Sequence, residues 1–234
     1  MTRHGSYESQ EHFPFLRLKH REKSYTADTK NMKKTLFLLA WVIIMSVTVY
    51  ALNYLNYAEY LADKHVIVRQ RPIENYALGD KVLRQEVIGM AIRLTGLNFR
   101  TVDHIDLPEL YTCENTFTDV KQNMPNTWAC RSIETAAKHG IITTSNKEFH
   151  PEADITRAEA ITMVLSAVNL MPKVAEGETW TDVVMKTSLD LGIISDEKLS
   201  PDEKITRGEL FYIVTNIIKV LYKQEIDYID SLAK

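Results

Sequence analysis

The pattern Thr-Arg-x-Glu occurs twice, at residues 156–159 and 206–209, each time directly ahead of an apolar run. The Thr and the Glu have the spacing of a capping box, in which the Thr hydroxyl accepts a free N–H of the first helical turn and the Glu carboxylate accepts the Thr amide. The Arg between them presents a planar fork of donors beside free backbone N–H groups, which suits a carboxylate. The pattern predicts two helix starts and leaves open whether each is also a binding site.

A third, weaker copy of the pattern lies upstream. Residues 81–97 match the last part of the two other copies, with Leu83-Arg84-Gln85-Glu86 in place of Thr-Arg-x-Glu. Arg84 and Glu86 keep the charged positions, but Leu83 lacks the hydroxyl with which Thr caps a helix. We therefore expect a third helix start with a less complete site.

The pattern belongs to a longer repeat. Residues 117–170 and 180–221 share an aromatic-Thr-Asp-Val start, a helical stretch ending in Gly-Ile-Ile, a polar loop, a Pro, Ile-Thr-Arg-x-Glu and a long apolar run. Gly140 and Gly192 fit the left-handed residue that ends a helix. Each unit is therefore predicted as helix, loop, helix, and the fold as all-α. The first copy lacks the front half of the unit.

The three long helices predicted after these starts are unusually apolar. In "AITMVLSAVNL" and "LFYIVTNIIKVL" hydrophobic side chains cover most of the helix circumference, which is typical of central helices surrounded by others. No unit can cover its apolar face alone, so we expect the units to associate into one compact domain over about residues 74–222.

One uncharged run precedes the repeats. Residues 35–52 span about 27 Å as a helix, enough to cross a bilayer. Residues 1–34 hold eight Lys/Arg against four acidic residues, which predicts a cytoplasmic N-terminus and an external remainder. A cleaved signal peptide is the alternative, because "MKKTLFLLA" from Met32 and the small residues near Ala51 fit one. Translation from Met32 is also compatible with this pattern.

The exported part is acidic and contains both cysteines. Residues 52–234 carry 20 Lys/Arg and 27 Asp/Glu, a formal charge of −7, which argues against a nucleic-acid partner because phosphate binding needs a basic face. An even number of cysteines in an oxidising compartment favours a disulfide between Cys113 and Cys130. The alternative is two unpaired, small hydrophobic side chains.

No residue pattern predicts catalysis. The seven histidines are scattered without metal-ligand spacing, and the chain has neither a Gly-rich phosphate loop nor a nucleophile motif. Asp119 and Asp182 recur in Thr-Asp-Val, where paired acid/base carboxylates are one interpretation and helix capping or turn formation is the better one. We expect no enzyme activity, no metal and no cofactor.

The repeat resembles a known family. The order Phe-x-Asp-Val, Trp, helix, Gly-Ile-Ile, Phe-x-Pro and Ile-Thr-Arg-Ala-Glu in residues 117–160 is similar to the S-layer homology domain, which holds many bacterial surface proteins to the cell wall. In that family three tandem copies form a pseudo-threefold helical bundle whose grooves bind secondary cell-wall polysaccharide, often through a pyruvylated sugar. The resemblance implies noncovalent attachment to an envelope glycan.

The resemblance also suggests which residues bind the glycan. They are the charged and capping residues of the three motifs: Thr156, Arg157 and Glu159, then Thr206, Arg207 and Glu209, with Arg84 and Glu86 as the weakest set. Trp128 is expected in the core, and a place beside a sugar is the alternative. The loops depart from the family, since the glycines before Phe-x-Pro are absent and Leu199 replaces the Phe.

Together these inferences predict the domain boundaries and the localisation of the protein. We expect a single-pass membrane protein with an external C-terminal domain, or a secreted wall-associated protein if the signal is cleaved. A structural module that binds another envelope protein is the competing hypothesis. The predicted parts are a basic segment at 1–34, the membrane or signal helix at 35–52, a stalk or leading helix at 53–73, repeats at 74–115, 116–171 and 178–222, and a tail at 223–234.

Overall fold

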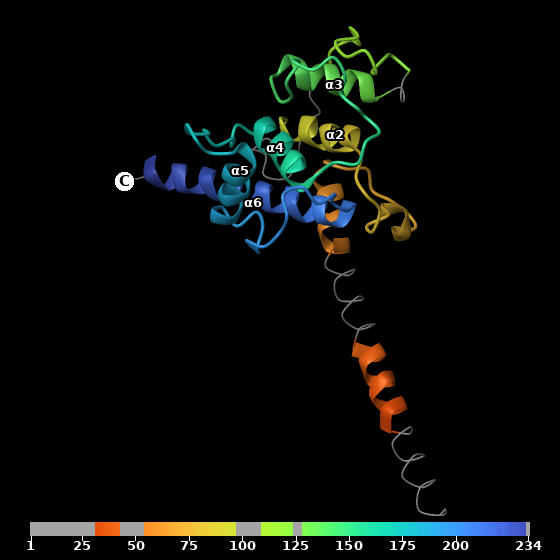
Figure 1. Ribbon diagram of the computed structural model, residues 1–234. Helices are drawn as coiled ribbons and strands as arrows, with labels where there is room; N and C mark the ends of the chain where they lie inside the picture. Colours follow the sequence, from red (N-terminus) through yellow and green to blue (C-terminus); the bar gives the residue numbers. More distant parts are fainter. Residues whose placement is uncertain (1–30, 43–53, 97–108, 124–127, 233–234) are drawn as a thin grey trace, which may run out of the picture. The chain divides into compact units, whose positions relative to one another are not determined.

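The computed structural model describes residues 31–42, 54–96, 109–123 and 128–232 (Figure 1). The chain divides into two compact units, Met1–Val49 and Tyr50–Lys234. The described part of the first unit is a helix at 31–42. The second unit contains the repeats.

The regular secondary structure described in the second unit is helical, apart from isolated β-bridges, as the all-α prediction expects. A helix at 54–63 comes first. The elements after it are the 3-10 helix η1 (Ile73–Tyr76), α2 (Arg84–Leu94), α3 (Ala129–Lys138), α4 (Arg157–Ala167), α5 (Trp180–Asp190) and α6 (Arg207–Leu232).

The long helices start where the motifs predict. In α4 the Glu159 amide donates to the Thr156 hydroxyl at 3.3 Å, and the Thr156 amide donates to the Glu159 carboxylate at 3.0 Å. Thr206 and Glu209 form the same capping box ahead of α6. Ahead of α2 the Leu83 amide still donates to the Glu86 carboxylate, at 3.0 Å, but the Leu83 side chain has no acceptor for a helix N–H.

The short helices end at left-handed residues. Gly140 has a φ of 69° and Gly192 a φ of 70°, a conformation that glycine adopts without steric cost. After each glycine an Ile amide donates back to the last turn of the helix, from Ile141 and from Ile193. His65 has a φ of 62° and is followed by the same backbone bond, so the helix at 54–63 ends as α3 and α5 do.

The stalk predicted at residues 53–73 is wrong. Ala58, Leu61 and Val66 are fully buried in the core, and the ring of Tyr57 packs edge-on against Tyr212 of α6, with 5.4 Å between centroids. An apolar helix face that is covered by α6 is part of the domain and cannot act as a spacer. The helix at 54–63 thus precedes α2 as α3 precedes α4.

The long helices form the centre of the unit, as their apolar sequences predict. Helix α2 packs against both α3 and α4, and α4 packs in turn against α5 and α6 (Figure 1). Their inward side chains have no solvent exposure, among them Ile88 in α2, Leu165 in α4 and Ile217 in α6. The short helices lie outside this centre.

The segments ahead of the three long helices bind each other in a closed cycle. The Val82 amide donates to the Ile205 carbonyl at 3.2 Å, the Ile205 amide to the Ile155 carbonyl at 3.3 Å, and the Ile155 amide to the Val82 carbonyl at 3.0 Å. All three side chains are fully buried. Each motif therefore begins from a point where the three copies meet.

Two further expectations concern single side chains. Cys113 and Cys130 form the predicted disulfide, with 5.6 Å between their Cα atoms, and it joins the loop before the second copy to α3. The core prediction for Trp128 is wrong, because this residue is 43% exposed.

Among the described residues, no helix is both long enough and apolar enough to cross a membrane. The predicted membrane or signal segment at 35–52 is described only as far as residue 42, and residues 43–52 lie outside the described part.

Candidate functional site

Each motif arginine pairs with the motif glutamate of another copy. The guanidinium of Arg84 lies 2.9 Å from the Glu159 carboxylate, and that of Arg157 lies 3.0 Å from Glu209. Together these pairs link the first copy to the second and the second copy to the third. The cycle is completed by an ion pair between Arg207 and Glu86. The predicted site residues are thus brought together, but as partners of one another.

Arg157 is the most deeply placed of the three arginines. Its side chain is 2% exposed, against 19% for Arg84 and 26% for Arg207. Besides Glu209 it binds the Glu203 carboxylate at 2.8 Å and the Ser200 carbonyl. This guanidinium is thus directed at acceptors of its own protein, which suits a structural role.

Arg84 and Arg207 are held in matching ways. The Nε of Arg84 donates to the Phe149 carbonyl and that of Arg207 to the Tyr76 carbonyl, both at 2.9 Å. The Arg84 guanidinium also lies over the Phe149 ring, 5.0 Å from its centroid. The side chains of Arg84 and Arg207 are partly exposed, so a ligand could reach them.

The glutamates are stabilised as carboxylates. Burial alone would raise the pKa of Glu159, but the hydrogen bond from the Thr156 amide and the charge of Arg84 outweigh burial, and the net pKa is lowered. The pKa of Glu209 is lowered against the same burial effect by the Thr206 amide and by Arg157. Both residues therefore keep their charge at neutral pH.

The sequence did not reveal that the arginines act across copies. It also missed Glu203 and Ser200, which bind Arg157 from the loop of the third copy. One signal was present, because an Arg and a Glu recur at fixed positions of every copy, as expected for side chains that pair around a cycle. The residue types of Glu203 and Ser200 gave no indication that they bind Arg157.

The two repeated aspartates each accept hydrogen bonds from residues of their own copy. The Asp119 carboxylate accepts the amides of Phe149 at 2.9 Å and His150 at 2.7 Å, and so holds the loop ahead of α4. The Asp182 carboxylate accepts the Thr179 hydroxyl at 2.6 Å in the first turn of α5. Both contacts fit the turn and capping interpretation of these carboxylates.

A cysteine and carboxylate cluster also lies beside α3. Three possible ligand atoms all lie within 4.8 Å of one another: the Sγ atoms of Cys113 and Cys130 and a carboxylate oxygen of Glu134. The two sulfurs are joined in the disulfide, and the Glu134 carboxylate accepts the Thr116 amide at 2.8 Å and its hydroxyl at 2.6 Å. Since metal binding by cysteine requires free thiolates, this cluster fits a structural connection.

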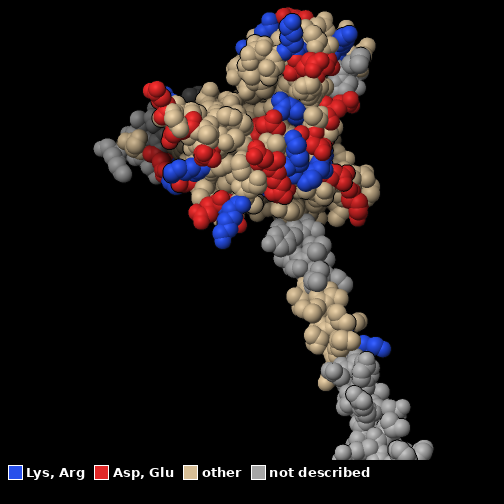
Figure 2. All heavy atoms as spheres, viewed as in Figure 1, with Lys and Arg blue, Asp and Glu red and all other residues tan. Residues whose placement is uncertain are grey.

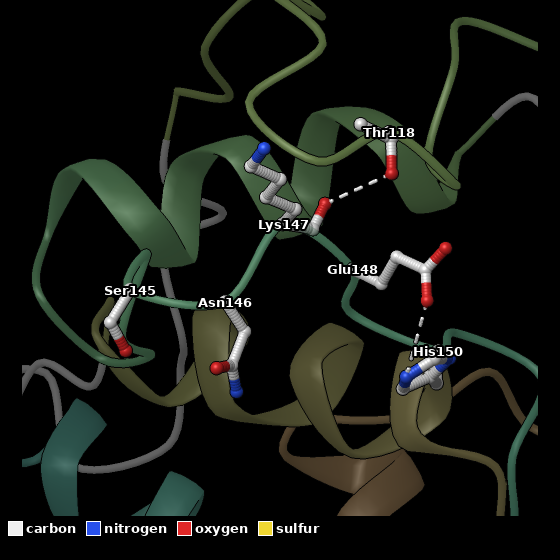
Figure 3. Close-up of a pocket in the computed structure, with 6 residues that line it drawn as sticks. All are labelled: Thr118, Ser145, Asn146, Lys147, Glu148 and His150. Carbon is white, nitrogen blue, oxygen red and sulfur yellow. Dashed lines mark hydrogen bonds and ion pairs between the residues drawn. The ribbon is translucent and has the colours of Figure 1, made fainter.

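A polar pocket of about 470 Å³ opens on the loop between α3 and α4 (Figure 3). The Thr118 hydroxyl donates to the Lys147 carbonyl at 3.2 Å, and the His150 imidazole lies 3.7 Å from the Glu148 carboxylate. The pocket can hydrogen-bond to a polar ligand but is shallow and open to solvent. Its lining residues are Thr118, Ser145, Asn146, Lys147, Glu148 and His150.

One face of the second unit mixes both signs of charge (Figure 2). On the face drawn in Figure 2, acidic and basic side chains are interspersed over the helices, without a broad basic area. This face therefore fits the expectation that nucleic acid is not a partner.

Part of the chain is similar to known proteins. Residues 116–161 match the family model of the S-layer homology domain. Over 154 residues the chain is 25% identical to a middle cell wall protein of Brevibacillus brevis, which corresponds to 65% of this chain and 13% of that protein.

Two enzymes are also similar to parts of the chain. Exoglucanase XynX of Acetivibrio thermocellus is 29% identical over 122 residues, and an amylopullulanase of Thermoanaerobacterium thermosulfurigenes is 27% identical over 134 residues. The matches cover 47% and 52% of this chain but only 11% and 7% of the two enzymes, so the chain spans a small part of each relative's length. A domain of the matched family fits anchoring at the cell envelope. Residues 116–161 of the chain are thus similar to the S-layer homology domain.

Proposed function

We propose that residues 54–222 form three S-layer homology repeats arranged with pseudo-threefold symmetry. The closed cycles of backbone hydrogen bonds and of Arg–Glu pairs support this arrangement, because each copy makes the same contacts to the next. The second and third repeats keep the ranges 116–171 and 178–222. The first begins at residue 54 instead of 74 and continues to about 115, since the helix at 54–63 takes the place that α3 and α5 have in the other copies.

The proposed function is noncovalent anchoring at the cell envelope through a wall polysaccharide. The observation that carries it is the match of residues 116–161 to the S-layer homology domain. A cell wall protein among the relatives supports it. We propose a secondary cell-wall polysaccharide as the ligand, with a pyruvylated sugar as one form of its acidic group.

The exposed members of the motif cycle are the proposed contact residues. The side chains of Arg84 and Arg207 are partly exposed, and so are those of their partners Glu159 and Glu86. Thr156, Thr206 and Glu209 contribute through the caps that fix the starts of α4 and α6. Arg157 contributes by holding the second and third copies together, since its burial keeps a ligand away.

The polysaccharide and the membrane would be connected by this chain. With residues 35–52 in the membrane and the repeats outside, the protein would tether the cytoplasmic membrane to the wall or to a surface layer. If the segment is instead a cleaved signal, a secreted wall-associated protein results. Sequencing the N-terminus of the mature protein decides between these two forms.

A second candidate function has an observation of its own. Because all three motif arginines are used in pairs between copies, the motif can serve the fold without a ligand. The domain would then dock another envelope protein on the faces between copies. We propose this as the alternative.

The test is co-sedimentation of the purified full-length chain with cell-wall sacculi, before and after the attached polysaccharide is removed. We expect binding to intact sacculi and none to stripped sacculi. An Arg84→Gln, Arg207→Gln double variant should bind at least about tenfold more weakly, since each guanidinium offers charge-assisted hydrogen bonds to the oxygen atoms of the glycan.

Circular dichroism of the double variant controls for folding, and Lys186→Gln is the matched control, because it removes an exposed cation from α5 outside the motif cycle. Equal binding of the folded chain to intact and stripped sacculi would reject the glycan function. Capture of one envelope protein, unaffected by glycan removal, would then support the alternative.

A further inference from the structure

The Trp128 side chain packs against α2 along one edge and is partly exposed to solvent. It precedes α3 and is 43% exposed. One edge of the indole rests against α2, where its nearest atom lies 3.2 Å from the position that a Cβ on Gly89 would take. The absence of a side chain at Gly89 therefore lets the ring lie close to the α2 backbone. An indole that is anchored along one edge and open to solvent elsewhere offers a rigid apolar surface.

Arg93 lies at the same place. Its Nη1 is 3.7 Å from that same Cβ position at Gly89, and it donates to the Gly89 carbonyl at 3.2 Å. The side chain is partly buried, and burial lowers the pKa of Arg93. Among the described residues no carboxylate forms an ion pair with it, whereas Arg84, Arg157 and Arg207 each have one. A partly buried guanidinium without a counter-charge favours an anion from outside.

The other copies lack this combination. Trp180 precedes Gly192 by the same number of residues as Trp128 precedes Gly140, and it is similarly exposed, at 44%. The positions that match Arg93 in the two other long helices are Ser166 in α4 and Asn216 in α6. Both are neutral. The positive charge thus distinguishes the face between the first and second copies from the corresponding faces.

We propose that Trp128 and Arg93 form a binding site for a sugar that carries a carboxylate. The apolar face of the sugar ring would lie on the exposed indole, and the carboxylate would accept from the Arg93 guanidinium in place of a counter-charge from the protein. This inference rests on the proposed glycan function, but it assigns the acidic group to a residue outside the Thr-Arg-x-Glu motifs.

The test uses polysaccharide released from sacculi with a muramidase and immobilised on a biosensor, either untreated or with its carboxyl groups reduced to alcohols. The analyte is the full-length chain, as wild type, Arg93→Gln or Trp128→Leu. Trp180→Leu is the matched control, because it removes an equally exposed indole that has no arginine at the corresponding position.

On untreated polysaccharide we expect Arg93→Gln and Trp128→Leu to bind about tenfold more weakly than wild type, which corresponds to about 1.4 kcal/mol. Trp180→Leu should bind within about twofold of wild type. Carboxyl reduction should weaken wild type by the same tenfold factor and leave Arg93→Gln unchanged, because the two changes remove one interaction. Thermal unfolding of each variant verifies the fold.

The glycan function and the Trp128–Arg93 site are rejected by different results. No binding of wild type to untreated polysaccharide rejects the glycan function and the inference with it. Tight wild-type binding that Arg93→Gln leaves unchanged rejects the inference alone. Wild-type binding that survives carboxyl reduction also rejects it, including the case in which a phosphate on the glycan supplies the negative charge. If Arg93→Gln does not fold, the reduced polysaccharide and Trp128→Leu decide the matter.

Discussion

At the scale of single residues, the guanidinium of Arg157 joins the second copy to the third. It is almost completely buried and is shared between the Glu209 and Glu203 carboxylates. Removing one member of a buried pair leaves the remaining charge without compensation, which costs far more than the loss of an exposed pair. In the second copy the motif arginine is therefore a structural residue, although an arginine in this position also suits an acidic ligand.

Arg157→Glu should destabilise the fold by about 3–5 kcal/mol, because it places a buried carboxylate against two others. Lys186→Gln, which breaks an exposed pair in α5, should change the free energy of unfolding by no more than about 0.5 kcal/mol. Urea unfolding of both variants, followed by circular dichroism, measures the difference. An unchanged midpoint for Arg157→Glu would contradict the buried pair.

The sequence identified the charged residues of the motifs but not their partners. The capping boxes were predictable because Thr and Glu at that spacing act within one helix turn. The ion pairs join residues far apart in the chain, such as Arg207 with Glu86, and depend on how the copies pack. Local spacing carries no information about such packing, and for the same reason it misplaced Trp128.

At the scale of elements, the helix at 54–63 closes the unit by packing on the start of α6. A Cβ on Gly208 would lie 2.8 Å from the Tyr54 ring and 3.1 Å from the Leu78 carbonyl. In the second copy the same position of the motif is Ala158, so a methyl group is buried there. The glycine of the third copy therefore reflects the close approach of the first helix.

Gly208→Ala should loosen this helix and destabilise the protein by about 1–3 kcal/mol, the usual cost of overpacking. In the exposed interior of a helix the same change would be stabilising. Thermal unfolding of the full-length chain measures the sign. A second variant, Gly208→Ala with Tyr54→Ala, should recover part of the loss relative to Tyr54→Ala alone, and a stabilised single variant would refute the close contact.

The helix at 54–63 was hard to recognise because its sequence lacks the usual signals. His65 follows the helix by two residues, at the place where Gly140 and Gly192 follow α3 and α5, and no Thr-Asp-Val precedes the helix. The backbone nevertheless adopts a left-handed conformation at His65, at a steric cost that the buried Val66 and Leu61 offset. Only the packed structure shows that a histidine fills the place of a helix-ending glycine.

At the scale of the whole molecule, stability depends on carboxylates that connect the copies. The pKa values of Glu159 and Glu209 are lowered in the folded state. A group with a lowered pKa contributes stability that is present above its unfolded pKa, about 4.3 for Glu, and that is lost as the pH falls through the folded value. Acid should therefore separate the copies.

The urea midpoint should fall steeply as the pH drops from about 5 to about 3, since the glutamates are protonated in that range. Glu159→Gln should be less stable at pH 7 and should lose less stability on acidification, because Gln cannot titrate. Unfolding curves of wild type and variant at both pH values make the comparison. Identical pH dependence in the two proteins would exclude Glu159 from this effect.

The closed cycle of contacts also determines where a pulling force would act. The chain enters the unit at the helix 54–63, which packs against α6 of the last copy, so first and last copies are neighbours. In a protein that tethers a membrane to a wall, tension would reach the domain at this junction. A load that enters through the helix at 54–63 would therefore act on the contacts of Tyr57 with Tyr212 and of Tyr54 with Gly208.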